Sequence, residues 1–229
     1  MYIDFAWEYL KRNKEYVNDW NNYSKRTETM SEVIEKNNFA ERKWGLLEFA
    51  NPNLSAENNV FWSQAVSTRS ARITLSKTGD IPASYILMNR NQFQNKILVL
   101  SDGSACVKVY NENSYFQFFL SASDLCENDI ENKFVYISLN PNCFATIKRV
   151  MLFLLDGKYE NSKKCEHAKS LRAYDKYLSG MTHRDIANEI YSEEARVNHW
   201  HSDSWLRAKV RYKIQRAKSM INGGYHGIL

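Results

Sequence analysis

The most chemically distinctive stretch of the chain lies near its end, where six basic residues and no acidic residue fall between Ser204 and Lys218. The six are Arg207, Lys209, Arg211, Lys213, Arg216 and Lys218. Lysine and arginine donate charge-assisted hydrogen bonds to phosphate, and arginine also fits the O6 and N7 atoms of guanine. A helix that needs only solubility usually mixes both signs of charge. The stretch therefore indicates a polyanionic partner, and we expect double-stranded DNA.

The excess of positive over negative charge lies entirely in the last 67 residues of the chain. From Lys163 to Leu229 there are 13 Lys and Arg against 7 Asp and Glu, a net charge of +6. The first 162 residues hold the other 18 basic and 19 acidic residues, a net charge of −1. This distribution is expected if the carboxy-terminal segment alone meets the polyanion.

A helical wheel at about 100° per residue separates the basic stretch into a core stripe and two flanks. The stripe consists of Leu206, Val210, Ile214, Ala217 and Ile221. One flank carries Arg207, Arg211 and Lys218, and the other carries Trp205, Lys209, Tyr212 and Arg216. In a major groove the amino-terminal residues of such a helix reach base edges and the later ones reach phosphates.

Shorter helices precede this one. Thr182 and Asp185 form a capping-box-like start for a helix from His183 to Tyr191. Further helices are predicted from Cys143 to Leu155, from Glu166 to Leu178 and from Asp203 to Asn222. A short helix followed by a long basic one is the order of a helix-turn-helix. The candidate DNA contacts are Thr182, His183, Arg184, His201, Ser202 and Ser204, with the six basic residues of the last helix.

The rest of the chain predicts an α+β protein with three segments. Residues 1–50 predict a helical segment, with helices from Asp4 to Lys11 and from Asn13 to about Asn37. Residues 51–140 predict an antiparallel β-domain, because β-prone runs alternate with turns. These runs are residues 73–75, 85–88, 97–100, 106–110, 115–120 and 134–139. Residues 141–229 predict the four-helix domain that contains the helix-turn-helix.

Several classes of protein do not fit the sequence. No apolar run approaches the roughly 18 residues of a membrane span, so we expect no membrane contact. The first residues do not form a secretory signal, so we expect a cytoplasmic, nucleoid-associated protein. Phosphate loops and common hydrolase motifs are absent, so we expect no enzyme and no cofactor. The four cysteines form no CxxC pair, and buried, reduced thiols are expected for Cys106, Cys126, Cys143 and Cys165.

A cluster of aromatic and histidine residues precedes the last helix and has two interpretations. His199, Trp200, His201 and Trp205 are compatible with a metal or stacking site. No second pair of ligands with suitable spacing accompanies them, so packing under a loop is the favoured interpretation and no metal is expected. Contact of His201 or Ser204 with a base or phosphate stays open.

Two parts of the sequence resemble known modules. The run from Trp7 to Asn13, followed by Tyr16 and Trp20, resembles the pattern W-E-F-L-R-R-N-x-x-Y-x-x-x-W of an amino-terminal module in proteobacterial transcriptional regulators. The carboxy-terminal third resembles the helix-turn-helix domain of regulators of integrative and conjugative elements. The matching segments there are residues 171–175, 180–190, 206–211 and 223–225. The middle of the chain resembles the family only at Val60, Phe61 and Trp62 and in its strand-rich character.

The resemblance implies transcriptional control of conjugative or mobile-element genes, either by an activator at promoter DNA or by an antiactivator that binds a partner transcription factor. RNA polymerase and a partner regulator are the protein partners that it implies. The basic last helix favours DNA over the antiactivator alternative. The sequence departs from the family at residues 191–200, where the connection is longer than a minimal helix-turn-helix turn and contains Glu193 and Glu194. The operator, the oligomeric state and the role of the β-domain stay open.

Overall fold

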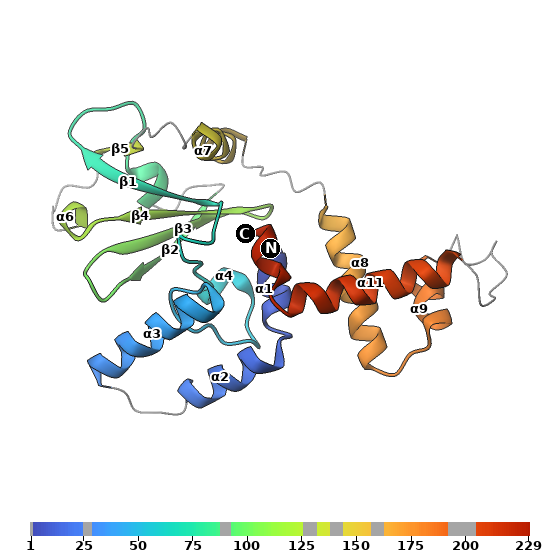
Figure 1. Cartoon of the computed structure of the whole chain (residues 1–229). Helices are drawn as coiled ribbons and strands as arrows, with labels where there is room; N and C mark the ends of the chain where they lie inside the picture. The colour runs from blue at the N-terminus through green and yellow to red at the C-terminus, as the bar shows by residue number, and fades with distance from the viewer. Residues whose placement is uncertain are drawn as a thin grey trace. The chain divides into compact units, whose positions relative to one another are not determined.

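A computed structural model describes residues 2–24, 29–87, 93–125, 132–137, 144–156, 163–191 and 205–229 (Figure 1). Its contacts divide the chain into two compact units. Unit 1 comprises residues 1–4, 18–160 and 229, and unit 2 comprises residues 5–17 and 161–228. The fold is mixed α and β, as predicted, with all described strands in unit 1.

Unit 1 is built on a five-stranded sheet with the order β2-β3-β4-β1-β5. The strands are β1 (Ser70–Ser76), β2 (Gln94–Val99), β3 (Ala105–Tyr110), β4 (Tyr115–Leu120) and β5 (Phe134–Ile137). β1 pairs with β4 in parallel, and the other pairs are antiparallel. The prediction of an antiparallel domain is therefore wrong at β1 and β4. Alternating apolar residues identify a strand but do not identify its neighbour in the sheet.

Five of the six predicted β-prone runs form strands, and the run at residues 85–88 does not. Its described residues belong to α5 (Ser84–Leu87). An apolar run of four residues fits one helical turn as well as a short strand, so periodicity could not separate the two. The predicted end of the last strand, at residues 138 and 139, lies outside the described residues.

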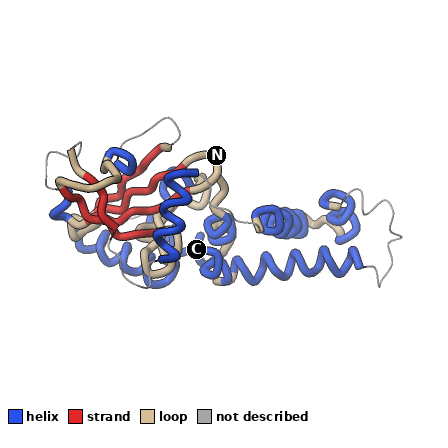
Figure 2. The backbone as a smooth tube through the Cα atoms, turned by 90° about the horizontal axis from the view of Figure 1, so that it is seen from above, coloured by secondary structure: helices blue, strands red, loops and turns tan. Residues whose placement is uncertain are grey.

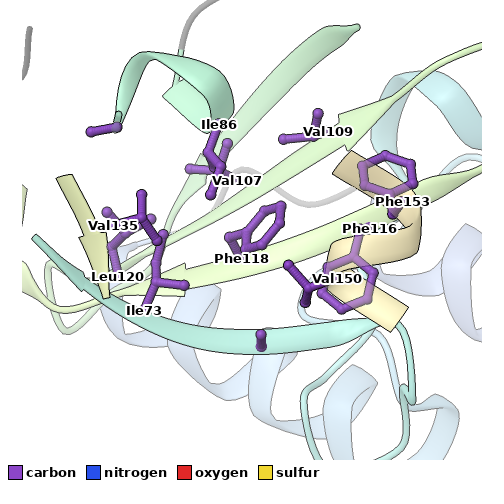
Figure 3. Close-up of a cluster of buried hydrophobic side chains, with 12 residues drawn as sticks. Ile73, Ile86, Val107, Val109, Phe116, Phe118, Leu120, Val135, Val150 and Phe153 are labelled. Carbon is purple, nitrogen blue, oxygen red and sulfur yellow. The ribbon is translucent and has the colours of Figure 1, made fainter. Parts of the chain in front are cut away.

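One face of the sheet carries the main core of unit 1 (Figure 3). Phe116 and Phe118 of β4 pack there with Phe153 and Val150 of α7 (Phe144–Asp156), a helix that the sequence predicted. Ile86 of α5 lies over the same face, beside Val107 of β3. Burial of these large side chains, at about 25 cal/mol for each Å² removed from water, stabilises the sheet.

The opposite face holds a buried network of polar and aromatic groups. Lys108 of β3 is fully buried, and its ammonium donates to the carbonyl oxygens of Ala56 (2.5 Å) and Val60 (2.8 Å). Ala56 begins α4 (Ala56–Asn59). Asp4 is also buried and accepts a 2.8 Å hydrogen bond from the Trp62 indole. Buried charges require such partners, so this network fixes the segment before β1 against the sheet.

The predicted helix from residue 13 to 37 is divided in two. The chain forms α2 (Lys14–Ser24) and α3 (Met30–Trp44), with residues 25–28 outside the description. Thr29 begins α3 with a capping box. Its hydroxyl accepts a hydrogen bond from the main-chain amide of Glu32, and the Glu32 carboxylate accepts one from the main-chain amide of Thr29. Gly45 ends the helix in the left-handed region, at φ 73°. The T-x-x-E sequence at Thr29 is a local signal for this second start that the prediction of one helix overlooked.

Unit 2 is helical and includes residues from both ends of the chain. It contains α1 (Phe5–Leu10), α8 (Lys164–Leu178), α9 (His183–Ile190), α11 (Trp205–Ile221) and the short 3₁₀ helix η2 (Gly224–Ile228). The predicted helices agree with α1, α8, α9 and α11 to within about two residues. Figure 2 shows α11 as a long blue helix, with α8 and α9 against one side of it.

The four helices that were expected to form one carboxy-terminal domain do not all pack together. Three of its helices lie in unit 2, whereas α7 packs on the sheet of unit 1 and α1 contributes to unit 2 instead. Residues 192–204, which join α9 to α11, lie outside the described residues. The helix-turn-helix geometry and the domain boundaries at residues 50 and 140 therefore stay predictions.

Candidate nucleic-acid interface

The core stripe predicted for α11 is confirmed. All five of its residues are buried: Leu206, Val210, Ile214, Ala217 and Ile221. The first three pack with Ala173 of α8 and with Ile186 and Ala187 of α9. Because one side of α11 is fixed in this way, its two flanks have defined directions.

Lys213 does not belong to either flank, contrary to its prediction as a DNA contact. It is only 3% exposed and forms an ion pair with Glu166 of α8. On the wheel it lies about 20° from Leu206, at the edge of the core stripe, so the angle itself indicated burial. A buried, paired ammonium does not reach a phosphate, and we remove Lys213 from the interface.

The first flank of α11, formed by Arg207, Arg211 and Lys218, is termed here the arginine flank. Arg207 and Arg211 are exposed and form no ion pair with any residue in the described part of the chain. Lys218 is half-buried, with its ammonium 4.8 Å from the centre of the Tyr177 ring. The two guanidinium groups are therefore available to a ligand, while the ammonium is partly held by an aromatic face.

The second flank of α11 combines basic and aromatic groups. The Lys209 ammonium lies 4.3 Å from the ring centre of Tyr191 and 5.0 Å from that of Trp205. Trp205 is 49% exposed and Tyr212 is 59% exposed. Arg216 is half-buried. This flank presents positive charge beside apolar rings, which suits phosphates and sugars as well as a protein surface.

The start of α9 gives the remaining described candidates. The Thr182 hydroxyl accepts from the Asp185 amide at 3.3 Å and donates to the Asp185 carboxylate at 2.6 Å, so the predicted cap is confirmed and occupies the hydroxyl. The His183 ring stacks on Tyr177 with centroids 6.1 Å apart. Arg184 is exposed. His201, Ser202 and Ser204 lie outside the described residues, as do His199 and Trp200.

Two acidic residues of unit 2 are paired with basic residues that do not belong to the arginine flank. Glu189 of α9 contacts Arg172 at 2.7 Å and Lys176 at 3.1 Å, and the hydrogen bond from Arg172 holds its pKa below the usual value. Asp175 of α8 accepts from Arg12 at 2.8 Å. Local pairing neutralises these carboxylates and reduces the repulsion that a polyanion would meet.

Helix α1 supports this surface from behind, which sequence reasoning did not anticipate. Tyr9 is fully buried, and its hydroxyl lies 3.1 Å from Nδ1 of His167 on α8. Asn13 donates to the carbonyl oxygen of Ile221, the last residue of α11, at 2.9 Å. The Trp7 and Leu10 side chains are also fully buried. The available indication of such packing was that α1 is apolar on nearly all sides, since every residue from Phe5 to Leu10 except Glu8 is apolar or aromatic.

His167 is the buried ionisable residue at this contact. Burial lowers its pKa to about 4, and the charge of nearby Arg216 acts in the same direction. Burial also raises the pKa of the Tyr9 hydroxyl to about 12. His167 Nε2 is buried and has no hydrogen-bond partner among the described residues. The imidazole is therefore neutral in the folded protein at neutral pH.

The described part of the chain contains two free cysteines and no cluster of possible metal ligands. Cys106 is buried, which raises its pKa to about 12, but Cys165 is exposed and contradicts the expectation of a buried thiol. Cys126 and Cys143 lie outside the described residues. No group of three or more possible metal ligands gathers among the described residues, and none of the described helices is long and apolar enough to cross a membrane.

Two family models match the chain. Residues 152–229 match a family described as "T6SS, Transcription factor, DNA binding domain". Residues 2–47 match a family described as a proteobacterial transcriptional regulator-like domain. No curated protein matches the chain. Each model spans less than half of the chain, and together they support a transcriptional regulator that carries a DNA-binding domain, formed by the segment that contains α8, α9 and α11.

Proposed function

We propose that this regulator binds duplex DNA through the arginine flank of α11 and the start of α9. The observation that carries the proposal is the exposure of Arg207 and Arg211 on an acid-free helix, inside the segment that matches a DNA-binding domain. Arginine is the residue that most often makes specific contacts with guanine, since its planar fork matches O6 and N7. The two arginines are assigned to base recognition.

The spacing of the two arginines suits this role. They lie four residues apart on one side of the helix, which is about 6 Å along its axis. This length is close to two base-pair steps of about 3.4 Å each. The helix also has no acidic residue in its first turn, whereas α8 and α9 both have one.

Other basic groups supply affinity without sequence preference. Arg184 at the start of α9 and Lys209, Arg216 and Lys218 on α11 are assigned to phosphates. Thr182 remains a candidate phosphate contact only through its main-chain groups, because its hydroxyl is hydrogen-bonded to the Asp185 carboxylate. His183, His201, Ser202 and Ser204 remain candidates for base or phosphate contacts.

The kind of gene that is regulated is suggested by two resemblances. The description of the matched carboxy-terminal family names T6SS and a transcription factor, and this supports control of T6SS genes. The sequence resemblance favours conjugative or mobile-element genes instead. We propose activation at a promoter, with RNA polymerase as a protein partner, and we propose no enzymatic activity and no cofactor.

The proposal is tested by comparing base recognition with general attraction. A duplex is selected from a random pool by the wild-type chain, and affinities for this duplex and a scrambled one are measured by fluorescence anisotropy. Arg207→Ala and Arg211→Ala should each weaken binding to the selected duplex by about 5-fold to 150-fold, the equivalent of about 1 to 3 kcal/mol, with a much smaller effect on the scrambled duplex. Arg42→Ala, which removes an exposed arginine from α3 in unit 1, is the matched control and should change neither.

Equal losses on both duplexes would show that α11 supplies charge only. Absence of binding to any duplex would favour the second candidate function, an antiactivator that binds a partner transcription factor. The exposed Trp205 and Tyr212 on the second flank support that candidate, because tryptophan, tyrosine and arginine are the common residues of protein-binding hot spots. Their replacement by alanine would then weaken partner binding.

A further inference from the structure

Strand β2 lies at one edge of the sheet in unit 1, and its hydrogen bonding differs from that of β5 at the other edge. Among the described strands it pairs only with β3. The opposite edge strand, β5, also forms hydrogen bonds with the chain segment before α5. Val135 donates to the Ile81 carbonyl oxygen, and Ala83 donates to that of Lys133, both at 2.7 Å. The β5 edge is therefore partly occupied by the chain itself.

The pairing of β2 with β3 sets the direction of its main-chain groups. At the turn, the Leu100 amide donates to the Ser104 carbonyl oxygen at 2.8 Å. Residues that exchange hydrogen bonds across an antiparallel pair recur at every second position. Leu98 and Lys96 therefore direct their main-chain groups toward β3. Ile97 and Val99 direct theirs away from β3, toward the open edge.

The same two residues expose apolar side chains. Ile97 is 53% exposed and Val99 is 66% exposed. They lie opposite Val107 and Ala105 of β3, which are fully buried, so they continue the core face of the sheet to its edge. Edge strands of this kind are templates for pairing with another strand, and proteins usually protect them with charges, prolines or a covering segment.

We propose that β2 pairs with β2 of a second copy of this chain, antiparallel and with Ile97 at the twofold axis. A twofold axis between two antiparallel strands of one sheet is perpendicular to that sheet, so one residue lies opposite its own copy. Lys96, Ile97 and Leu98 are the candidate central residues of β2, because a centre at Gln94, Asn95 or Val99 would place half of the strand or more opposite residues outside it or would lie at its end. Each choice brings different groups together, and these differences select one of them.

Charge and length both select Ile97. A pairing centred on Lys96 places two ammonium groups directly opposite each other, which destabilises a strand pair. A pairing centred on Leu98 places Asn95 opposite residue 101, which lies beyond the end of β2. With Ile97 at the centre, Ile97 faces its own copy, Val99 faces Asn95 of the second copy and Lys96 faces Leu98. No like charges then lie opposite each other.

The pairing explains both unusual features of this edge. The outward main-chain groups of Ile97 and Val99 gain partners. The two Ile97 side chains cover each other at the axis, and each Val99 side chain lies opposite Asn95 of the second copy and diagonal to its Ile97. The resulting dimer is symmetric, and a symmetric dimer suits duplex sites whose two halves are related by a twofold axis. The pairing itself does not require the proposed DNA binding, because it uses only residues of unit 1.

The first test measures the mass of the full chain by sedimentation velocity over a concentration series without DNA. We expect a species of twice 26.9 kDa that forms as concentration rises. Ile97→Lys places two ammonium groups opposite each other and should raise the dimer dissociation constant about tenfold or more. Tyr136→Lys is the matched control, because Tyr136 is 50% exposed on β5, and it should leave the dimer intact.

The second test fixes the register by cysteine cross-linking. Ile97→Cys and Val99→Cys are each introduced into a chain that carries Cys165→Ser, since Cys165 is the exposed cysteine among the described residues. A short bismaleimide should join the thiol introduced at position 97 to its copy in high yield. The two residues at position 99 are separated by four positions, about 13 Å along the strands, so Val99→Cys should give little product above the parent chain.

A wild-type chain that stays monomeric throughout the series would overturn the proposal. An assembly that Ile97→Lys does not weaken, or equal cross-linking at positions 97 and 99, would also overturn it. Because no DNA is present, these outcomes are independent of whether α11 recognises bases. Loss of the dimer with intact DNA binding, or the reverse, is measurable in the same preparations.

Discussion

The buried His167 predicts that unit 2 loses stability as the pH falls. In the folded chain its pKa is lowered from 6.5 to about 4, chiefly by burial and then by the charge of Arg216. Below pH 6.5 the unfolded chain binds a proton at this residue, whereas the folded chain stays neutral there until about pH 4. The free energy of unfolding therefore decreases between about pH 6.5 and about pH 4, and this contribution is fully present above that window.

The size of the effect follows from the same pKa. A tenfold change in proton affinity corresponds to about 1.4 kcal/mol, so the lowered pKa corresponds to a loss of about 3 kcal/mol by about pH 4. The other groups that face His167 include Lys163, Lys213 and Glu166, of which only Glu166 favours the protonated ring. The carboxylate only partly offsets the burial and the basic groups, so the net effect is destabilisation in acid.

The assay is urea unfolding of the full chain at a series of pH values from about 7.5 to about 4, spanning the window set by the two pKa values and followed by circular dichroism at a helical wavelength. His167→Gln removes the ionisable group and should lose much less stability over this range than the wild type. His183→Gln removes a half-buried histidine from the start of α9 and should follow the wild type. Parallel curves for wild type and His167→Gln would refute the reasoning, because the pH dependence would then come from other groups.

Further substitutions test the packing and the assignment of charges. Ala187→Glu should lower the free energy of unfolding by several kcal/mol, since it places a carboxylate at a fully buried position of α9, whereas Asn188→Glu at an exposed position should have little effect in thermal unfolding. Lys213→Met should leave the salt dependence of DNA binding unchanged, while Lys218→Ala should reduce the slope of log affinity against log salt by about one unit. Leu10→Ala should destabilise unit 2 by about 2 to 5 kcal/mol, because it leaves a cavity beneath α1, and an unchanged urea midpoint would contradict this packing.

The parts of the structure that the sequence predicted are those that depend on local patterns. The stripe of α11 was predicted because five apolar residues at helical spacing have few alternatives to burial. The cap at Thr182 was predicted because the partner, Asp185, lies only three residues away. The bounds of β3 and β4 followed from alternation and turns in the same way.

The parts that the sequence did not predict depend on distant partners. Parallel pairing of β1 with β4 joins Ser70 to Gln117, far apart in the chain, and no local pattern records it. Lys213 was predicted to contact DNA because it is basic, although its angle on the helical wheel placed it beside the core stripe. Its partner is Glu166, 47 residues earlier in the chain. The packing of Tyr9 on His167 joins residues 158 positions apart and requires the tertiary fold.

The most direct test of the central claim is the salt dependence of wild-type binding to duplex DNA. If Arg184, Lys209, Arg216 and Lys218 each contact a phosphate, the plot of log affinity against log salt should have a slope of about −3.6, at about 0.9 for each contact, with any further contact making it steeper. The arginines that read bases should add little to this slope. Binding that is independent of salt, or no binding at the lowest salt concentration, would contradict the assignment of this surface to DNA.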